Sequence, residues 1–163
     1  MESALPQRKS ARLKDFDYSS PGAYFVTLCT EGKRQLLSQI VGEGLAPPAV
    51  RLSRYGVVAC EQIEAISSRF PCVRVDKYVI MPNHIHMILV IVDSGGASPS
   101  PTVSHVIGVF KSVTTRMCGC GPHLFQRSFH DHIIRGENDY LKIWEYIDTN
   151  PMKWEEDCFY SEE

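Results

Sequence analysis

Short runs rich in aromatic and β-branched residues recur along the chain and predict β-strands. The clearest of these runs are 24–30, 73–80 and 84–92. Residues 31–34 have turn chemistry, so 35–37 are predicted to form a short partner strand of a hairpin. We also expect a loop over 41–50, where two glycines and a proline pair stand, and a short extended piece at Leu124-Phe125.

Three other segments carry apolar residues at spacings of three and four, which is the helical pattern. They predict helices over 53–69, 103–117 and 138–150. Ser53 can cap the first helix, and Thr102 or Ser104 can cap the second. The third helix should end at Asn150, because a residue before a proline resists helical geometry.

Strands interleaved with helices, with a hairpin near the start, predict an α+β fold. We expect one antiparallel sheet with helices packed on a face. With 163 residues, the chain suits a single domain over 1–163 with one sizeable core. Residues 93–101 are rich in glycine, serine and proline, and they predict a flexible internal loop.

Composition and charge narrow the class of protein. The longest apolar run, 87–92, is much shorter than a membrane helix, and the N-terminus has no apolar signal segment. We therefore expect a cytoplasmic protein with no membrane partner. A net charge of −2 argues against a protein that coats nucleic acid indiscriminately.

The charges are unevenly distributed along the chain. Residues 1–17 form a basic N-terminal arm, whereas the C-terminus is acidic. The basic residues of the arm are Arg8, Lys9, Arg12 and Lys14, and the acidic ones are Glu155, Glu156, Asp157, Glu162 and Glu163. A basic arm can follow a phosphate backbone, and it can equally be a solvated tail.

Six cysteines lie far apart and without repeated pairing, which favours free thiols over a disulfide framework. Cys118, Cys120 and His123 are three soft ligands close together in the sequence and suggest a zinc site. A structural zinc site requires four ligands, and no fourth stands near these three.

His84 and His86 open the apolar run 84–92. A strand points residues i and i+2 to the same face, so the two imidazoles should lie side by side. Polar rings at the start of a buried strand need partners, and a metal ion can be that partner. A metal with open coordination positions can also hold a phosphate as a Lewis acid.

The last helix brings two further polar residues together. With Tyr140 at zero on a helical wheel, Leu141, Ile143, Trp144 and Ile147 form the buried stripe, and Tyr140 lies in its middle as a core residue. Tyr146 and Asn150 lie on the edge of the stripe, one turn apart. Asn150 can bind a metal through its amide oxygen. Alternatively, Tyr146 is a boundary aromatic residue and Asn150 only ends the helix.

A second pair, His130 and His132, has the same spacing as the first. These residues stand in polar, loop-like sequence without a buried strand after them. They can carry a metal or contact phosphate, but the first pair is the stronger candidate.

Together, these motifs resemble a known family. The series Met81-Pro82-Asn83-His84-Ile85-His86 and Tyr146-Ile147-Asp148-Thr149-Asn150-Pro151 resembles a REP-associated tyrosine transposase, one of the single-tyrosine HUH transposases of bacterial insertion sequences. The resemblance extends to 17–27, 110–112 and 131–135, and so spans roughly residues 8–157.

The resemblance implies a ferredoxin-like, RNA-recognition-motif-like sheet with the histidines on a central strand. His84 and His86 would bind a divalent ion, magnesium or manganese. Asn150 stands where many relatives carry a glutamine as the third ligand. Tyr146 matches the nucleophile, whose attack on DNA would leave a 5′-phosphotyrosine and a free 3′-hydroxyl, and strand transfer would reverse that step.

The partner implied is single-stranded or hairpin DNA, which basic residues would contact. The candidates are Arg12, Lys14, Lys111, Arg116, Arg127 and Arg135. Two alternatives remain open: a domesticated, catalytically silent binder of repeat-hairpin DNA, and a metal-dependent hydrolase in which Tyr146 is structural. Relatives include homodimers that share active sites as well as monomers.

Overall fold

The fold contains one main sheet and a separate hairpin. The computed structural model describes residues 13–42, 47–96 and 99–162. Four antiparallel strands form the main sheet in the order β4-β5-β1-β6. They are β1 (Gly22–Cys29), β4 (Val73–Ile80), β5 (His84–Ile91) and β6 (His130–Ile133). The hairpin consists of β2 (Ser38–Val41) and β3 (Ala49–Leu52).

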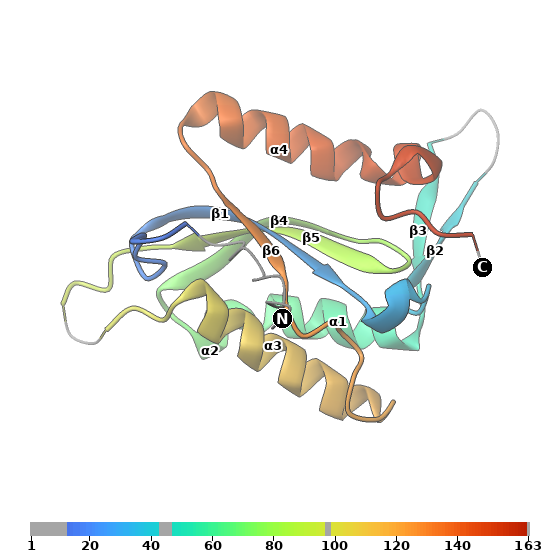
Figure 1. Ribbon diagram of the computed structural model, residues 1–163, viewed down its shortest axis with the longest axis horizontal. Helices are drawn as coiled ribbons and strands as arrows, with labels where there is room; N and C mark the ends of the chain where they lie inside the picture. The colour runs from blue at the N-terminus through green and yellow to red at the C-terminus, as the bar shows by residue number, and fades with distance from the viewer. Residues whose placement is uncertain (1–12, 43–46, 97–98, 163) are drawn as a thin grey trace, which may run out of the picture.

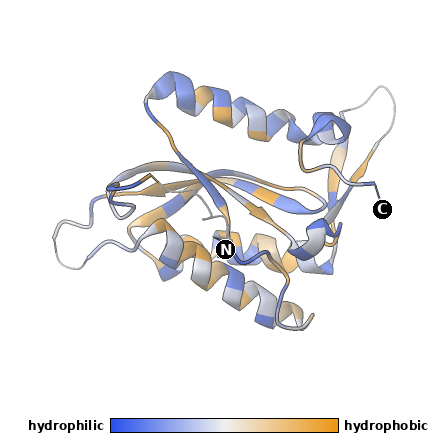
Figure 2. Cartoon of the chain, viewed as in Figure 1, coloured by the Kyte–Doolittle hydropathy of each residue, from blue (hydrophilic) through white to orange (hydrophobic). Residues whose placement is uncertain are grey.

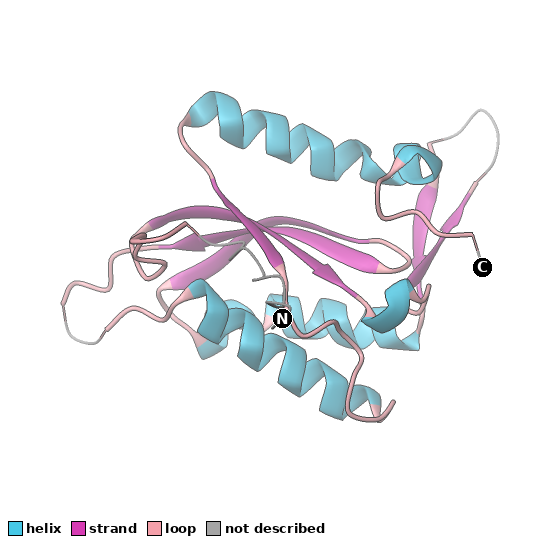
Figure 3. Cartoon of the chain, in the orientation of Figure 1, coloured by secondary structure: helices cyan, strands magenta, loops and turns pink. Residues whose placement is uncertain are grey.

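Helices cover both faces of the main sheet (Figures 1 and 3). One face packs against α1 (Arg54–Glu64), α2 (Ile66–Arg69) and α3 (Val103–Cys118), and the other against α4 (Glu137–Thr149). Two short 3₁₀ helices complete the fold, η1 (Glu31–Lys33) and η2 (Asn150–Glu156). Apart from the β2–β3 insertion, the strand order and connections are ferredoxin-like, so the predicted α+β class is confirmed.

The two faces of β5 belong to two different cores. Ile85, Met87, Leu89 and Ile91 join the large core beneath α1 and α3. Ile88 and Val90 point to the opposite face, where they pack with Ile147 of α4. His84 and His86 share that second face by the alternation of the strand. Figure 2 shows α4 as mostly hydrophilic, in keeping with this smaller core.

Several local predictions are confirmed. The Ser53 hydroxyl accepts a hydrogen bond from the Gly56 amide, and the Thr102 hydroxyl accepts one from the His105 amide, so both cap their helices. Phe125 pairs with Thr30 in an isolated bridge, as the predicted extended piece requires. The described part of 93–101 contains no helix or strand, and the flexibility predicted for this loop stays a prediction.

Other predictions were wrong. The helix over 53–69 is broken at Ala65 into α1 and α2. The hairpin partner of β1 predicted at 35–37 does not form, because β1 lies between β5 and β6. The strand instead begins at Ser38 and pairs with β3, whose residues fall within and just after the predicted loop 41–50.

No helix in the described part of the chain is long and apolar enough to cross a membrane.

Candidate active site

A tight turn between β4 and β5 places the first histidine. The Met81 amide donates to the His84 carbonyl over 2.8 Å, so Met81-Pro82-Asn83 closes a hairpin and β5 begins at His84. The His84 and His86 ring centroids lie 4.5 Å apart on the α4 face of the sheet. Both residues are almost fully buried, at 0% and 1% exposure. The same-face arrangement follows from the two-residue period of a strand.

Each imidazole uses its Nδ1 atom for a hydrogen bond within the protein. His84 Nδ1 lies 2.8 Å from Asn83 Oδ1, and His86 Nδ1 lies 2.8 Å from Thr27 Oγ1. Thr27 is the cross-strand neighbour of His86 on β1. Histidines that bind metals commonly hold one ring nitrogen in this way and present the other to the ion.

A buried carboxylate completes a cluster that the sequence did not predict. Asp157 lies just after η2, with 1% of its side chain exposed and its Oδ2 atom 3.8 Å from His84 Nε2. Ligand atoms of His84, His86 and Asp157 all lie within 4.8 Å of one another. In the sequence, Asp157 stands out only as one of the acidic residues of the C-terminus. No local sequence pattern identifies Asp157 as a site residue. It lies beside His84 only because η2 and the turn after it return the chain to the sheet.

Asn150 belongs to the same cluster. It ends α4 and is 2% exposed, and its Nδ2 atom donates to Asp157 Oδ2 over 2.7 Å. Its Oδ1 atom and His84 Nε2 are buried polar atoms without a hydrogen-bond partner among the described residues. Such atoms are costly to bury unless something binds them.

The donor set suits a divalent cation. It comprises two imidazole nitrogens, one carboxylate and one amide oxygen, all of them atoms that bind divalent cations in proteins. The orphaned His84 Nε2 and Asn150 Oδ1 are the atoms that such an ion would satisfy. The predicted ligands His84, His86 and Asn150 are therefore brought together, with Asp157 added to them.

Burial sets the protonation state of the histidines. It lowers the pKa of His84 from 6.5 to about 4, although the nearby Asp157 carboxylate acts in the opposite direction. Burial also lowers the pKa of His86 well below its ordinary value, with a further contribution from His84. Both imidazoles are thus neutral at pH 7, which is the form that binds a metal.

Tyr146 reaches the cluster from α4. Its hydroxyl lies 3.4 Å from His86 Nε2, and its ring contacts those of His86 and Phe25. The side chain remains 40% exposed, which fits the predicted position at the edge of the helix stripe. Burial of the hydroxyl and the Asp157 charge raise the pKa of Tyr146 to about 12. The phenol is therefore protonated at neutral pH.

The C-terminal segment covers the histidines. The Phe159 ring lies 4.7 Å from the His84 ring and 5.8 Å from the His86 ring. The Trp154 ring closes another side, 5.9 Å from His84. The Asn83 amide donates to the Phe159 carbonyl over 2.8 Å and so ties this segment to the β4–β5 turn. The cluster is closed in this conformation.

The predicted basic residues that lie within the described ranges do not gather around this cluster. Lys111, Arg116 and Arg127 line a groove of about 770 Å³ on α3, on the opposite face of the sheet. The Lys111 ammonium donates to the carbonyls of Gln126 and Arg127, and burial lowers its pKa. Lys14 and Arg135 are exposed, and Arg12 lies outside the described residues.

The second histidine pair lies on β6 rather than in a loop, which corrects that prediction. His130 pairs with Thr27 and His132 with Phe25, so both belong to an edge strand beside the cluster. His132 Nε2 lies 2.9 Å from Asp139 Oδ2 at the start of α4. Among the described residues, only His84, His86 and Asp157 form a group of three or more His, Cys, Asp or Glu ligands, so the Cys118, Cys120 and His123 zinc site is not supported.

The predicted buried stripe of α4 was too wide. Tyr140 and Ile143 pack beside Ile147 in the second core, and the Tyr140 hydroxyl donates to Asp76 Oδ2 over 2.8 Å. Leu141 and Trp144 are exposed instead. This narrow stripe still fixes the side of α4 that faces the sheet.

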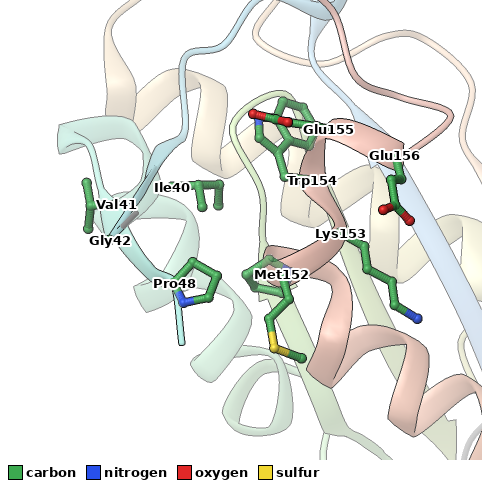
Figure 4. Close-up of a pocket in the computed structure, with 10 residues that line it drawn as sticks. Ile40, Val41, Gly42, Pro48, Met152, Lys153, Trp154, Glu155 and Glu156 are labelled. Atoms are coloured by element: carbon green, nitrogen blue, oxygen red, sulfur yellow. The ribbon is translucent and has the colours of Figure 1, made fainter. Parts of the chain in front are cut away.

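A separate pocket of about 300 Å³ lies between the β2–β3 hairpin and η2 (Figure 4). Ile40 and Pro48 flank it on one side, and Met152 and Trp154 on the other. Trp154 also contacts His84, so η2 separates this pocket from the cluster. None of the predicted site residues within the described ranges lines it. The candidate chemistry therefore lies at the cluster.

Comparisons with known proteins place the chain among relatives. No known family model matches it. A solved structure of a REP-associated tyrosine transposase bound to a REP hairpin aligns with a TM-score of 0.64 and 22% identity, covering 88% of this chain and 74% of that one. A Deinococcus radiodurans structure, provisionally assigned as a transposase, aligns with a TM-score of 0.47 and 15% identity over 85% of this chain and 95% of its own.

A sequence relative comes from Haemophilus influenzae and carries the description "Uncharacterized protein". It is 33% identical over 175 aligned residues, which cover 96% of this chain and 94% of the relative. The first structural match shows that the fold is shared with a REP-associated tyrosine transposase. The chain belongs to the same family as the Haemophilus influenzae protein.

Proposed function

We propose that the protein is a metal-assisted DNA transposase that cleaves one strand through Tyr146 and transfers it. The observation that carries the proposal is the 3.4 Å separation between the Tyr146 hydroxyl and His86 Nε2, within the His84, His86 and Asp157 cluster. A phenol beside a candidate metal site brings together a nucleophile and a possible Lewis acid for phosphoryl transfer. The fold match and the motif resemblance point to the same chemistry.

The residues that would hold the ion are His84, His86, Asp157 and Asn150. A magnesium or manganese ion bound there would neutralise phosphate oxygens and orient the scissile bond. The neutral imidazoles supply lone pairs, and the buried carboxylate supplies negative charge in a region with little solvent. Asn150 joins this set through Oδ1 while its Nδ2 atom holds Asp157 in place.

Tyr146 would be the nucleophile. Its oxygen forms a bond to phosphorus as the bond from phosphorus to the 3′-oxygen breaks, which leaves a 5′-phosphotyrosine and a 3′-hydroxyl. The phenol gives up its proton to water, and the leaving oxygen gains one, so the step balances. A pKa of about 12 means that the phenol needs the electrostatic help of the site before it can attack.

One chain supplies the whole proposed site. His84 and His86 come from β5, Tyr146 from α4, and Asp157 from the segment after η2. A monomer therefore contains every proposed catalytic group. Two hydrogen bonds hold α4 against β4 within that chain. The Tyr140 hydroxyl donates to Asp76, and the Lys77 ammonium donates to Asp148.

The partner we propose is single-stranded or hairpin DNA. The structural relative is described with a bound REP hairpin, which supports this choice of DNA for the present chain. A phosphate must pass the Phe159 ring to reach the buried histidines, so the C-terminal segment has to move during binding. Lys14 and Arg135 are candidates for contacts on the exposed surface.

The closed cluster also favours a second candidate, a protein that binds repeat hairpins without cleaving them. With His84 fully buried beneath Phe159, DNA could bind elsewhere and never reach the histidines. A cleavage assay separates the two functions. Incubation of single-stranded hairpin oligonucleotides with the protein and manganese should yield a product with a free 3′-hydroxyl, and chelation should prevent it. Tight binding of the same oligonucleotides without any product would favour the silent binder.

A further inference from the structure

Asn83 is a buried amide with every group in use. It is 0% exposed and stands in the turn between β4 and β5. Its Nδ2 atom donates to the carbonyl of Phe159 over 2.8 Å and to that of Lys33 over 3.2 Å. Carbonyl oxygens only accept hydrogen bonds, so these two contacts fix which end of the amide is nitrogen.

The fixed amide in turn fixes the tautomer of His84. Asn83 Oδ1 lies 2.8 Å from His84 Nδ1, and an amide oxygen can only accept. The proton of the neutral imidazole must therefore sit on Nδ1, which leaves the Nε2 lone pair facing Asp157. The opposite tautomer would set the Asn83 oxygen against a bare nitrogen lone pair.

His86 has no such constraint. Its Nδ1 atom bonds to the Thr27 hydroxyl, which can donate as well as accept. Thr27 thus orients the ring but is compatible with both tautomers. Within the cluster, the amide of Asn83 makes the contact that selects one.

We infer that Asn83 is a positioning residue that holds His84 as the Nδ1–H tautomer, so that Nε2 is ready to bind a divalent cation before any cation arrives. The inference rests on the proposed metal site. It does not depend on DNA cleavage, because the tautomer and the affinity for a metal are both properties of the protein alone. Mutation of a residue that hydrogen-bonds to a metal ligand, as Asn83 does to His84, commonly changes metal affinity by 10- to 100-fold.

The tautomer can be observed directly in the metal-free full chain. Two-bond ¹H–¹⁵N correlation spectra of protein labelled at histidine distinguish Nδ1–H from Nε2–H, and His84→Gln assigns the signal. Wild type should show the Nδ1–H form at pH 7. Asn83→Ala should lose this preference and bind Mn²⁺ about 10- to 100-fold more weakly in a titration. Asn138→Ala, at an exposed asparagine of α4, should change neither property.

If Asn83→Ala does not fold, the tautomer of His84 in the wild-type protein remains the test. An Nε2–H signal from His84 in the wild-type protein would overturn the inference. A folded Asn83→Ala protein with an unchanged tautomer and unchanged Mn²⁺ affinity would overturn it as well. Failure to cleave DNA with these results intact would instead count against the proposed function.

Discussion

Acid should destabilise the metal-free protein through its buried histidines. His84 has an ordinary pKa of 6.5 in the unfolded chain and a pKa of about 4 in the folded one, because burial disfavours the charged form. The unfolded state therefore binds a proton first as the pH falls. The stability contributed by neutral His84 is present above pH 6.5 and is lost as the pH falls toward 4.

The size of this loss follows from the two pKa values. Between pH 7 and pH 5, His84 alone should remove about 2 kcal/mol of the unfolding free energy. The pKa of His86 is lowered as well, so this residue adds to the loss of stability. This range of pH lies largely above the titration of ordinary carboxylates, so the histidines dominate the change.

Urea unfolding in the presence of a chelator, at several pH values from 7 to 5, measures this loss. His84→Gln cannot titrate, so its unfolding free energy should fall by about 2 kcal/mol less than that of wild type over the range. His105→Gln removes an exposed histidine of α3 and serves as the control that keeps His84. Equal pH dependence in wild type and His84→Gln would refute the reasoning from burial.

Two further predictions concern access and DNA binding. Phe159→Ala removes the ring that lies over His84 and keeps Asp157, so Mn²⁺ should associate with the protein several-fold faster in stopped-flow mixing. An unchanged association rate would mean that Phe159 does not control entry of the ion. Arg135→Ala should weaken hairpin binding and reduce the slope of log affinity against log salt by about one, whereas Arg51→Ala on β3 should not. Equal slopes would remove Arg135 from the DNA path.

The main strands and helices could be predicted because their signals are local. The sequence runs that form β1, β4 and β5 are rich in β-branched or aromatic residues. Ser53 and Thr102 cap α1 and α3 as expected. The edge strand β6 escaped prediction because it has four residues and three of them are polar. A polar edge strand resembles a loop when only the sequence is considered.

The residues of the candidate site also divide into those that local patterns predict and those that depend on the path of the whole chain. His84 and His86 could be paired from the strand period, and Tyr146 and Asn150 from the helical turn. Asp157 could not, since its place beside His84 depends on the path of η2 after Pro151. The exposure of Trp144 was also unforeseen, because its ring lies over the Lys77 ammonium of the edge strand rather than in the core.

Covalent capture of DNA tests the central claim most directly. A single-stranded hairpin substrate labelled at its 3′ end, incubated with the protein and manganese, should leave its label on the protein, because Tyr146 would keep the 5′-phosphate end. Tyr146→Phe removes only the hydroxyl and should bind the same DNA without becoming labelled. A labelled adduct in Tyr146→Phe, or wild-type cleavage without any adduct, would contradict the proposed role of Tyr146.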